Sequence, residues 1–349
     1  MTTINPSFTA PAGKPIALIT GGTSGIGRAF ARLLAQRGYN LVIVARGTTG
    51  LAETAAELQA SGVACEQIRA DLADPETVTA LCEWVASRNF AFDVFVNNAG
   101  TGLYQPLATT DFAEAETALT VMGRAPVKLG GAVAQKMREA GSGQIINISS
   151  VQGFVPMGMY AAIKAFIRVW SESLALELAG TGVTVTAVLP GWVRSGFHRA
   201  SGGRRSGVPD FLWLDPQQVA AAGLRAAERG KIRCTPSRRY QVIAFLAEKG
   251  PRRVVNRVAR ALRSAKSSAS TKPSASTKLS ASTKPSVSTK LSASTKPSAS
   301  VPASTPAESP AATSGSSTGT VAGTFNDGVG TNHDIIQATN AELGEHGVR

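Results

Sequence analysis

Three polar side chains that could move a proton lie within one short stretch, SSVQGFVPMGMYAAIK, which spans residues 149–164. Tyr160 and Lys164 are four residues apart, so they share one face if this stretch is helical. A free tyrosine has a pKa of about 10 and is a poor base at pH 7. A nearby ammonium group lowers such a pKa by favouring the phenolate. The pair therefore indicates a side chain tuned to give a proton to a carbonyl or to take one from an alcohol.

A glycine-rich turn follows the first apolar run of the chain. IALIT (16–20) leads directly into TGGTSGIGRAF, which has glycines at positions 21, 25 and 27. Glycine permits a tight turn at the strand end, a close approach of backbone to a pyrophosphate, and close packing of a helix on a sheet. The helix that follows would present free N–H groups to the phosphates. An ordinary strand–helix turn remains the alternative. The candidate phosphate contacts are Gly21, Thr23, Ser24, Gly25, Ile26 and Gly27.

These residues need a scaffold, and the first 190 residues supply its pattern. Short apolar runs alternate with longer amphipathic stretches. Nearly continuous apolar strands separated by helices indicate a parallel sheet covered on both faces. We therefore predict an α/β fold with a doubly wound parallel sheet. The expected strands are 16–20, 41–45, 93–97, 144–149 and 183–189, with a weaker one at 66–70.

Composition divides the chain into four segments. Residues 1–14 form an N-terminal arm, and residues 15–263 have the apolar runs of one globular domain. Residues 264–323 are mostly Ser, Ala, Thr, Lys, Pro and Gly, with a six-residue repeat such as SASTKP, and we expect them to be disordered. Residues 324–349 form a C-terminal tail in which a short helix could form.

The net charge of +13 is concentrated near the end of the globular domain. Residues 1–193 carry about −1, whereas residues 194–263 carry +12. RRVVNRVARALRS (252–264) has an apolar stripe flanked by arginines, so it could lie on an anionic membrane or pack on the domain as a last helix. The lysine repeat could assist membrane contact or touch nucleic acid weakly.

Other sequence features exclude several classes of protein. The three cysteines, at positions 65, 82 and 234, form no C-x-x-C pair, which argues against a metal cluster and for a reducing compartment. No apolar run approaches 18 residues, and the first 15 residues lack a signal-peptide pattern. We expect a cytoplasmic protein that could be peripheral to a membrane.

Several motifs in a fixed order resemble those of the short-chain dehydrogenase/reductase family. They are TGGTSGIG, DLAD (71–74), NNAG (97–100), ISS (148–150), YAAIK (160–164) and PGWVRS (190–195). The resemblance implies a Rossmann-type fold, an NAD(P) cofactor that carries the hydride, a small carbonyl or alcohol substrate, and a homo-oligomer. Ser150, Tyr160 and Lys164 would be catalytic, with Ser150 bonded to the substrate oxygen and Lys164 also holding the nicotinamide ribose. The implied cofactor contacts beyond the phosphate loop are Asp71, Leu72, Asn98, Ala99, Gly100, Tyr160, Lys164, Pro190, Gly191, Val193 and Ser195.

The residue after the second strand bears on the choice of cofactor. An acid there would bind the ribose 2′-hydroxyl of NAD, and an arginine would bind the 2′-phosphate of NADP. The run LVIVA ends at Arg46, and no acid follows until Glu53. Arg46 therefore favours NADP(H) over NAD(H), with Arg28 as a candidate helper. A surface arginine at the strand end is the alternative.

Two features depart from the family pattern. Ser150 precedes Tyr160 by ten residues rather than about a dozen, which shortens the intervening loop. Ser149 could replace it only if the loop shifted, because strand alternation turns its side chain to the other face. Met122 stands where the family has a catalytic asparagine that links the lysine to water, and Pro126 should disturb the same helix.

The sequence therefore supports a leading hypothesis and a rival. The first is NADPH-dependent reduction of a ketone, aldehyde or 3-oxoacyl compound. The second is a catalytically impaired nucleotide-binding protein whose basic C-terminal region binds a membrane or a polyanion. The family resemblance implies that residues 194–213, rich in Gly and Arg, form a lid over the substrate, which either favours an anionic substrate or is simply solvated. His198 would lie in that lid.

Overall fold

The structure is a computed structural model that describes residues 13–103, 105–195 and 208–270. The chain divides into two units, Met1–Ser276 and Thr277–Arg349, and the second lies outside the described residues. The six-residue repeat, the expected C-terminal helix and His198 also lie outside them. Within the described part, no helix is long and apolar enough to cross a membrane.

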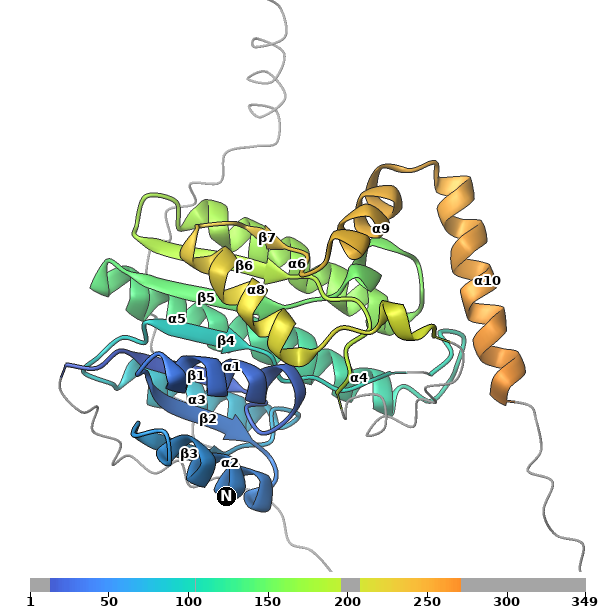
Figure 1. Cartoon of the computed structure of the whole chain (residues 1–349). Helices are drawn as coiled ribbons and strands as arrows, with labels where there is room; N and C mark the ends of the chain where they lie inside the picture. Colours follow the sequence, from blue (N-terminus) through green and yellow to red (C-terminus); the bar gives the residue numbers. More distant parts are fainter. Residues whose placement is uncertain (1–12, 104, 196–207, 271–349) are drawn as a thin grey trace, which may run out of the picture. The chain divides into compact units, whose positions relative to one another are not determined.

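A seven-stranded sheet with the order β3-β2-β1-β4-β5-β6-β7 forms the centre of the domain (Figure 1). All six pairings are parallel. The strand order reverses direction between β1 and β4, which is the doubly wound arrangement predicted from the sequence. The strands are β1 (Ile16–Thr20), β2 (Asn40–Ala45), β3 (Cys65–Arg69), β4 (Val94–Asn97), β5 (Gly143–Ile148), β6 (Val183–Val188) and β7 (Arg233–Cys234).

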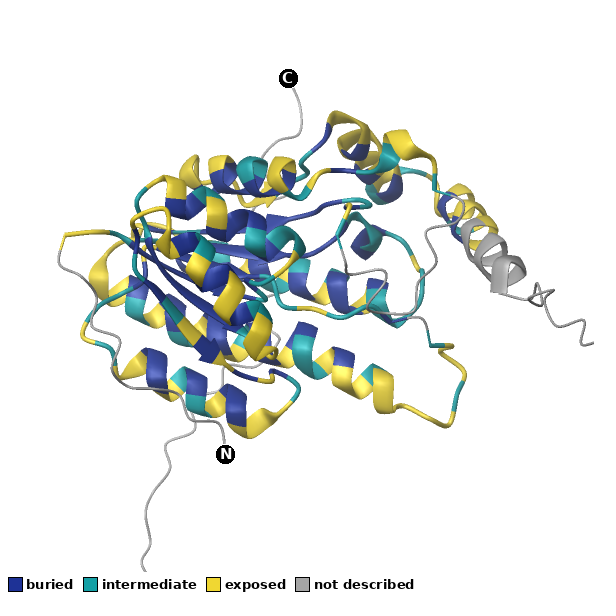
Figure 2. Ribbon diagram, turned by 60° about the horizontal axis from the view of Figure 1, so that its bottom comes forward, coloured by how far each residue is buried: buried dark blue, intermediate teal, exposed yellow. Residues whose placement is uncertain are grey.

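Helices cover both faces of this sheet (Figure 1). One layer packs α1 (Gly25–Gln36), α2 (Thr48–Gln59) and α8 (Pro216–Glu228) against the strands. The other packs α3 (Pro75–Ala86), α5 (Ala125–Ala140) and α6 (Met159–Glu177). The strands between these layers are buried along nearly their whole length, as the dark blue centre of Figure 2 shows. Burial on both faces explains why the sequence has continuous apolar runs there rather than alternation.

The helix that carries Met122 is continuous but irregular. It consists of α4 (Ala113–Leu119), a π-helical turn η1 (Thr120–Arg124) and α5. Pro126 lies at the start of α5, where a missing N–H costs least. Its carbonyl accepts a hydrogen bond of 3.0 Å from Asn97 Nδ2 of β4. The expected disturbance by Pro126 is therefore absorbed in one π turn that precedes it.

Two helices follow β7. They are α9 (Arg238–Lys249) and α10 (Arg252–Ser270). The predicted amphipathic helix is present as α10, which continues seven residues past the predicted domain end at residue 263.

Candidate active site

The glycine-rich turn forms a tight loop between β1 and α1. Gly21 and Gly25 adopt left-handed conformations, with φ of +65° and +51°. A Cβ on Gly27 would lie 2.2 Å from the carbonyl oxygen of Gly21, so this position admits no side chain. Ser24 occupies the N-cap position of α1 without a side-chain capping hydrogen bond, and no acidic residue follows in the first turn. The N–H groups of that turn have no intrahelical partners and can face an anion.

The loop is fastened to the end of β4. The Thr20 hydroxyl accepts hydrogen bonds of 3.0 Å from the N–H groups of both Asn98 and Ala99. Asn98 Nδ2 donates to the carbonyl oxygens of Thr20 and Gly21, at 2.9 and 3.2 Å. NNAG and the glycine loop are thus joined at the point where the strand order reverses. Thr20, a fully buried polar residue at the end of an apolar strand, was missed by the sequence analysis.

The residues predicted to contact the adenosine part lie at the ends of β2 and β3. Arg46 is exposed and directly follows β2, two residues before α2 begins. Asp71 is also exposed, and its carboxylate accepts a hydrogen bond from the N–H of Ala73, while Leu72 is buried. Arg28 is committed elsewhere, since its guanidinium bonds to Glu57. Among the arginines considered, Arg46 is therefore the one free to serve as predicted.

Ser150 lies just beyond the end of β5. Its hydroxyl accepts a hydrogen bond of 3.1 Å from the N–H of Gln152 and donates to the carbonyl oxygen of Pro190 at 3.4 Å. The second distance is long for an O–H donor, so this proton is weakly held. The hydroxyl of Ser149 instead donates to the Lys164 carbonyl at 2.7 Å. Ser149 is thereby occupied, and Ser150 keeps an available donor.

Tyr160 and Lys164 lie in the first two turns of α6. The Lys164 ammonium is 5.7 Å from the centroid of the Tyr160 ring and donates to the carbonyl oxygen of Ile148 at 2.9 Å. Burial lowers the pKa of Lys164 to about 8, so the group is still mostly protonated at pH 7. An ammonium has three donors, and within the described residues this one has a single hydrogen-bond acceptor, the Ile148 carbonyl. A buried cation with spare donors is typical of a functional site.

The short loop between Ser150 and Tyr160 is held closely on α6. It begins with a 3-10 turn, η2 (Val151–Phe154). A Cβ on Gly153 would lie 2.9 Å from the Ala165 nitrogen, so glycine is needed there. Phe154 is buried under the guanidinium of Arg168, 4.7 Å from the ring centroid. The ten-residue spacing is therefore accommodated by a compact turn.

Met122 fills the position at which the family resemblance implies an asparagine. Its side chain is only 1% exposed and packs in a small apolar cluster with Leu103, Ala118 and Ile163, beside Tyr160. A Cβ on Gly100 would lie 3.3 Å from the Met122 sulfur. An apolar wall thus occupies the side of Tyr160 where a polar relay was expected.

We expect Met122→Asn to raise turnover while lowering stability. The smaller amide leaves room for water beside Tyr160, and it restores a donor and an acceptor for proton transfer. Burying an amide in an apolar cluster should lower the free energy of unfolding by about 1–3 kcal/mol. Carbonyl-reduction rates and urea unfolding measure the two effects. Met122→Leu is the control that keeps the wall apolar, and equal or lower turnover of Met122→Asn would contradict the relay argument.

The segment after β6 completes the arrangement. A Cβ on Gly191 would lie 1.9 Å from the ring of Tyr240 on α9, so Gly191 must lack a side chain. The Tyr240 hydroxyl accepts from the N–H of Trp192 at 3.1 Å and donates to the carbonyl oxygen of Leu212 at 2.7 Å. Val193 is buried, and the Ser195 side chain meets the phosphate loop, 2.9 Å from an ideal Cβ on Gly25. The sequence analysis missed Tyr240, because nothing in RRYQVIAF marks it.

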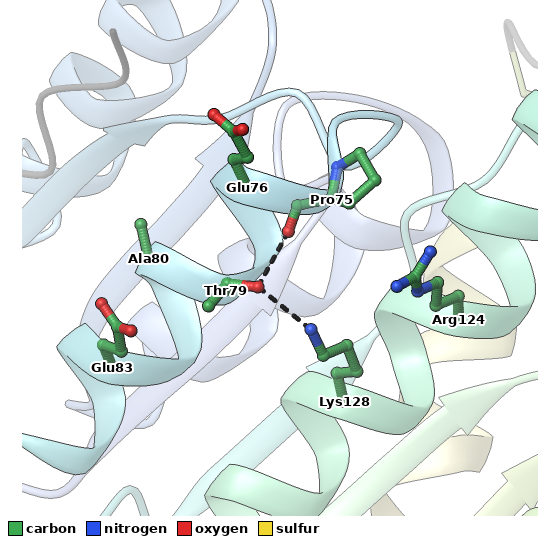
Figure 3. A pocket seen from close by; sticks show the side chains of 7 residues that line it. All are labelled: Pro75, Glu76, Thr79, Ala80, Glu83, Arg124 and Lys128. Carbon is green, nitrogen blue, oxygen red and sulfur yellow. Dashed lines mark hydrogen bonds between the residues drawn. The ribbon is translucent and has the colours of Figure 1, made fainter. Parts of the chain in front are cut away.

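An open groove of about 290 Å³ lies elsewhere, between α3 and the η1–α5 helix (Figure 3). Its charged lining residues are balanced, two acids against two bases, and Lys128 already donates to the Thr79 hydroxyl at 3.0 Å. Within the described residues, no cluster of His, Cys, Asp or Glu could hold a metal ion. The residues that could take part in a reaction therefore lie at the carboxyl ends of β1, β4, β5 and β6.

Comparison with known proteins decides the family. The profile of the short chain dehydrogenases matches residues 15–204, which is more than half of the chain. The chain belongs to the short-chain dehydrogenase family. Among relatives of this family, it is 37% identical over 212 residues to a granaticin polyketide synthase putative ketoacyl reductase 1 of Streptomyces violaceoruber, covering 56% of this chain and 75% of that protein. It is 39% identical over 190 residues to a putative ketoacyl reductase of Streptomyces coelicolor, covering 52% and 71%.

Solved structures of short-chain dehydrogenases agree with this assignment. A short-chain dehydrogenase from Sphingobium yanoikuyae in complex with NADPH has a TM-score of 0.60 and 31% identity, covering 75% of this chain and 98% of that one. A bulky-bulky ketone specific alcohol dehydrogenase from Comamonas testosteroni has a TM-score of 0.57 and 29% identity, covering 75% and 96%. The shared fold extends beyond residue 204. The protein is thus an oxidoreductase of the short-chain type.

Proposed function

We propose that this protein reduces a ketone, an aldehyde or a 3-oxoacyl compound with NADPH. The observation that carries the proposal is the buried Lys164 ammonium, which has donors to spare beside Tyr160. A protein rarely buries a charged lysine with so little compensation unless the charge is used. Ser150, with its weakly held proton, lies at the end of the strand whose last carbonyl holds Lys164.

The residues present fit a dinucleotide. Gly21, Gly25 and Gly27 leave backbone where side chains would block an approach, and α1 offers its N-terminus without a competing acid. Arg46 supplies a positive charge beyond β2, and Asn98, Ala99 and Gly100 line the neighbouring strand end. When bound, the nicotinamide cofactor would supply the hydride. Pro190, Gly191, Val193 and Ser195 would hold its amide end.

The chain's own residues would handle the proton. In this mechanism Ser150 turns its hydroxyl from the Pro190 carbonyl to the substrate oxygen and orients it. Tyr160 donates its phenolic proton to that oxygen as negative charge develops there. Lys164 stabilises the resulting phenolate and uses a remaining N–H to hold the cofactor ribose. Because Met122 makes the neighbourhood of Tyr160 apolar, the phenolate regains its proton slowly, and we infer a low turnover.

The substrate class is inferred from relatives. Two of them carry names that describe ketoacyl reductases, and one structural neighbour is described as specific for bulky ketones. Those names describe other proteins, but they support a carbonyl substrate here. A panel of ketones, aldehydes and 3-oxoacyl thioesters with NADPH tests the proposal. Turnover that depends on Tyr160 is expected, and NADPH binding without turnover on any of them would favour the rival, a nucleotide-binding protein without catalysis.

We expect Arg46→Ala to weaken NADPH binding while leaving NADH binding unchanged. Loss of a charge-assisted bond to the 2′-phosphate should cost about 1.5–3 kcal/mol, or roughly 10- to 150-fold in affinity. Fluorescence titration with both cofactors measures this. Arg138→Ala on α5 is the matched control, since Arg138 is exposed and far along that helix. Equal loss for NADH and NADPH would refute the assignment of Arg46.

We further infer that the protein forms a homo-oligomer. Large apolar side chains are exposed on α4 and α6, among them Leu119 at 44%, Phe166 at 48% and Val169 at 50%. Leu119 and Phe166 approach the same glycine, Gly123, so they form one patch. A patch of this kind is typical of a subunit interface. Light scattering of the full chain would reveal the oligomer.

A further inference from the structure

Helix α9 is apolar on both sides. Its inward face buries Tyr240, Ala244 and Ala247 against the domain. Its outward face exposes Val242 at 59%, Phe245 at 64% and Leu246 at 57%. A surface helix normally turns polar residues to water, so a second apolar face indicates another partner.

The start of α10 also exposes apolar side chains. Val255 and Ala259 are buried, whereas Val254 and Val258 are 57% and 53% exposed. In Figure 2, α10 is the helix whose last turns are grey, and exposed positions recur along its described part. Half of its apolar stripe is therefore covered and half is not. We call the exposed set the α9–α10 face, defined by Val242, Phe245, Leu246, Val254 and Val258.

Basic residues alternate along the sequence with the apolar residues of the α9–α10 face. Between Arg238 and Arg260 the chain has seven basic residues and one acid, Glu248. Glu248 does not compensate these seven charges, because it forms a salt bridge of 3.0 Å with Arg233 of β7, which lies outside this range. The face thus combines apolar centres with a strong, uncompensated positive charge.

We propose that the α9–α10 face docks on the surface of an anionic lipid membrane. Exposed Phe, Leu and Val side chains would enter the boundary between headgroups and acyl chains, and the arginines would contact acidic headgroups. A second copy of the chain fits less well, since a two-fold interface would bring the two basic sets together. Nucleic acid would use the charge but leave the aliphatic side chains in water. The proposal is independent of the catalytic assignment.

Helix α9, which carries part of the docking face, also packs against segments of the candidate active site. The inward side of α9 packs with Phe154 of η2 and Leu189, and Tyr240 lies beneath Gly191. Helix α9, which would lie on the membrane, therefore also supports η2 and the segment after β6, which flank the catalytic region. This arrangement suits a carbonyl substrate that partitions into lipid.

Vesicle flotation of the full chain tests the proposal. We expect binding to vesicles of phosphatidylcholine and phosphatidylglycerol in equal parts, weaker binding at 0.5 M salt, and little binding to pure phosphatidylcholine. Phe245→Ser with Leu246→Ser should lower partitioning roughly tenfold or more. Arg252→Gln with Arg253→Gln should lower it by roughly fivefold per charge.

Matched controls separate this face from other surfaces. Leu176→Ser removes an exposed apolar side chain from α6, and Lys136→Gln with Arg138→Gln removes two charges from α5. Neither should change vesicle binding. If Phe245→Ser with Leu246→Ser fails to fold, as judged by NADPH binding and circular dichroism, Val254→Ser with Val258→Ser replaces it.

Three results would overturn the proposal. One is binding that survives both sets of changes on the α9–α10 face. Another is binding lost only when the five lysines of residues 271–297 are changed to glutamine, which would assign it to the repeat. The third is a fall in oligomer mass caused by the Phe245 and Leu246 changes, which would make a second copy the partner.

Discussion

Tyr160→Phe is expected to reduce the rate of carbonyl reduction by about 10²- to 10⁴-fold while NADPH affinity changes little. The phenyl ring keeps its packing against the Met122 cluster, so only the hydroxyl and its proton are lost. Lys164 keeps its bond to the Ile148 carbonyl and its place beside the ring. The loss should therefore fall on kcat more than on KM. Single-turnover kinetics at saturating NADPH measure it.

Tyr39→Phe is the control for this experiment. Tyr39 is half-buried at the turn after α1 and lies in another part of the domain, so its hydroxyl should not matter to the rate. A reductase rate that is unchanged in Tyr160→Phe would remove the proton donor from the mechanism. Reduction would then proceed without the Tyr160 hydroxyl, and the proposed mechanism would fail.

Gly27→Ala is expected to abolish tight cofactor binding. The added methyl would lie 2.2 Å from the Gly21 carbonyl and 2.5 Å from Asn98 Nδ2. The Gly21 carbonyl belongs to the backbone and cannot move alone. The phosphate loop must therefore shift, and its hydrogen bonds to the end of β4 must break. Overpacking of this kind costs about 1–3 kcal/mol of stability. A loop displaced by about 1 Å should lower catalytic efficiency on the order of 100-fold.

Isothermal titration with NADPH and thermal unfolding measure the two losses. Gly131→Ala is the matched control, because a Cβ there meets nothing within 4 Å and lies in the middle of α5. It should be neutral or stabilising by about 0.5–1 kcal/mol. If Gly27→Ala bound NADPH as tightly as the parent, the loop would not be the phosphate site.

The sheet could be predicted from the sequence because its strands are buried on both faces. Continuous apolar runs such as IALIT and LVIVA are typical of strands that are buried on both faces. β7 escaped prediction because Arg233–Cys234 is two residues long and gains its place only by pairing with β6. Such a strand depends on tertiary contact rather than on local pattern.

The candidate site was predictable where it rests on motifs and unpredictable where it rests on packing. Ser150, Tyr160 and Lys164 lie at the strand and helix ends that the order of motifs indicated. The buried hydroxyl of Thr20 and the ring of Tyr240 were not foreseen, since each acts through a neighbour in space that is remote in sequence. The π-helical turn before Pro126 was not predicted either, because no pattern in the sequence indicates such a turn.

The ring of Tyr240 has a consequence for how this protein can be divided. It occupies the volume that any side chain at position 191 would need, and its hydroxyl joins Trp192 to Leu212. The enzyme is therefore not a complete module at residue 204, where the family profile ends. The part of the chain that must stay together extends through α9, because a side chain at position 191 requires a smaller residue at position 240. Chimeras that exchange C-terminal regions between relatives should keep that pair intact.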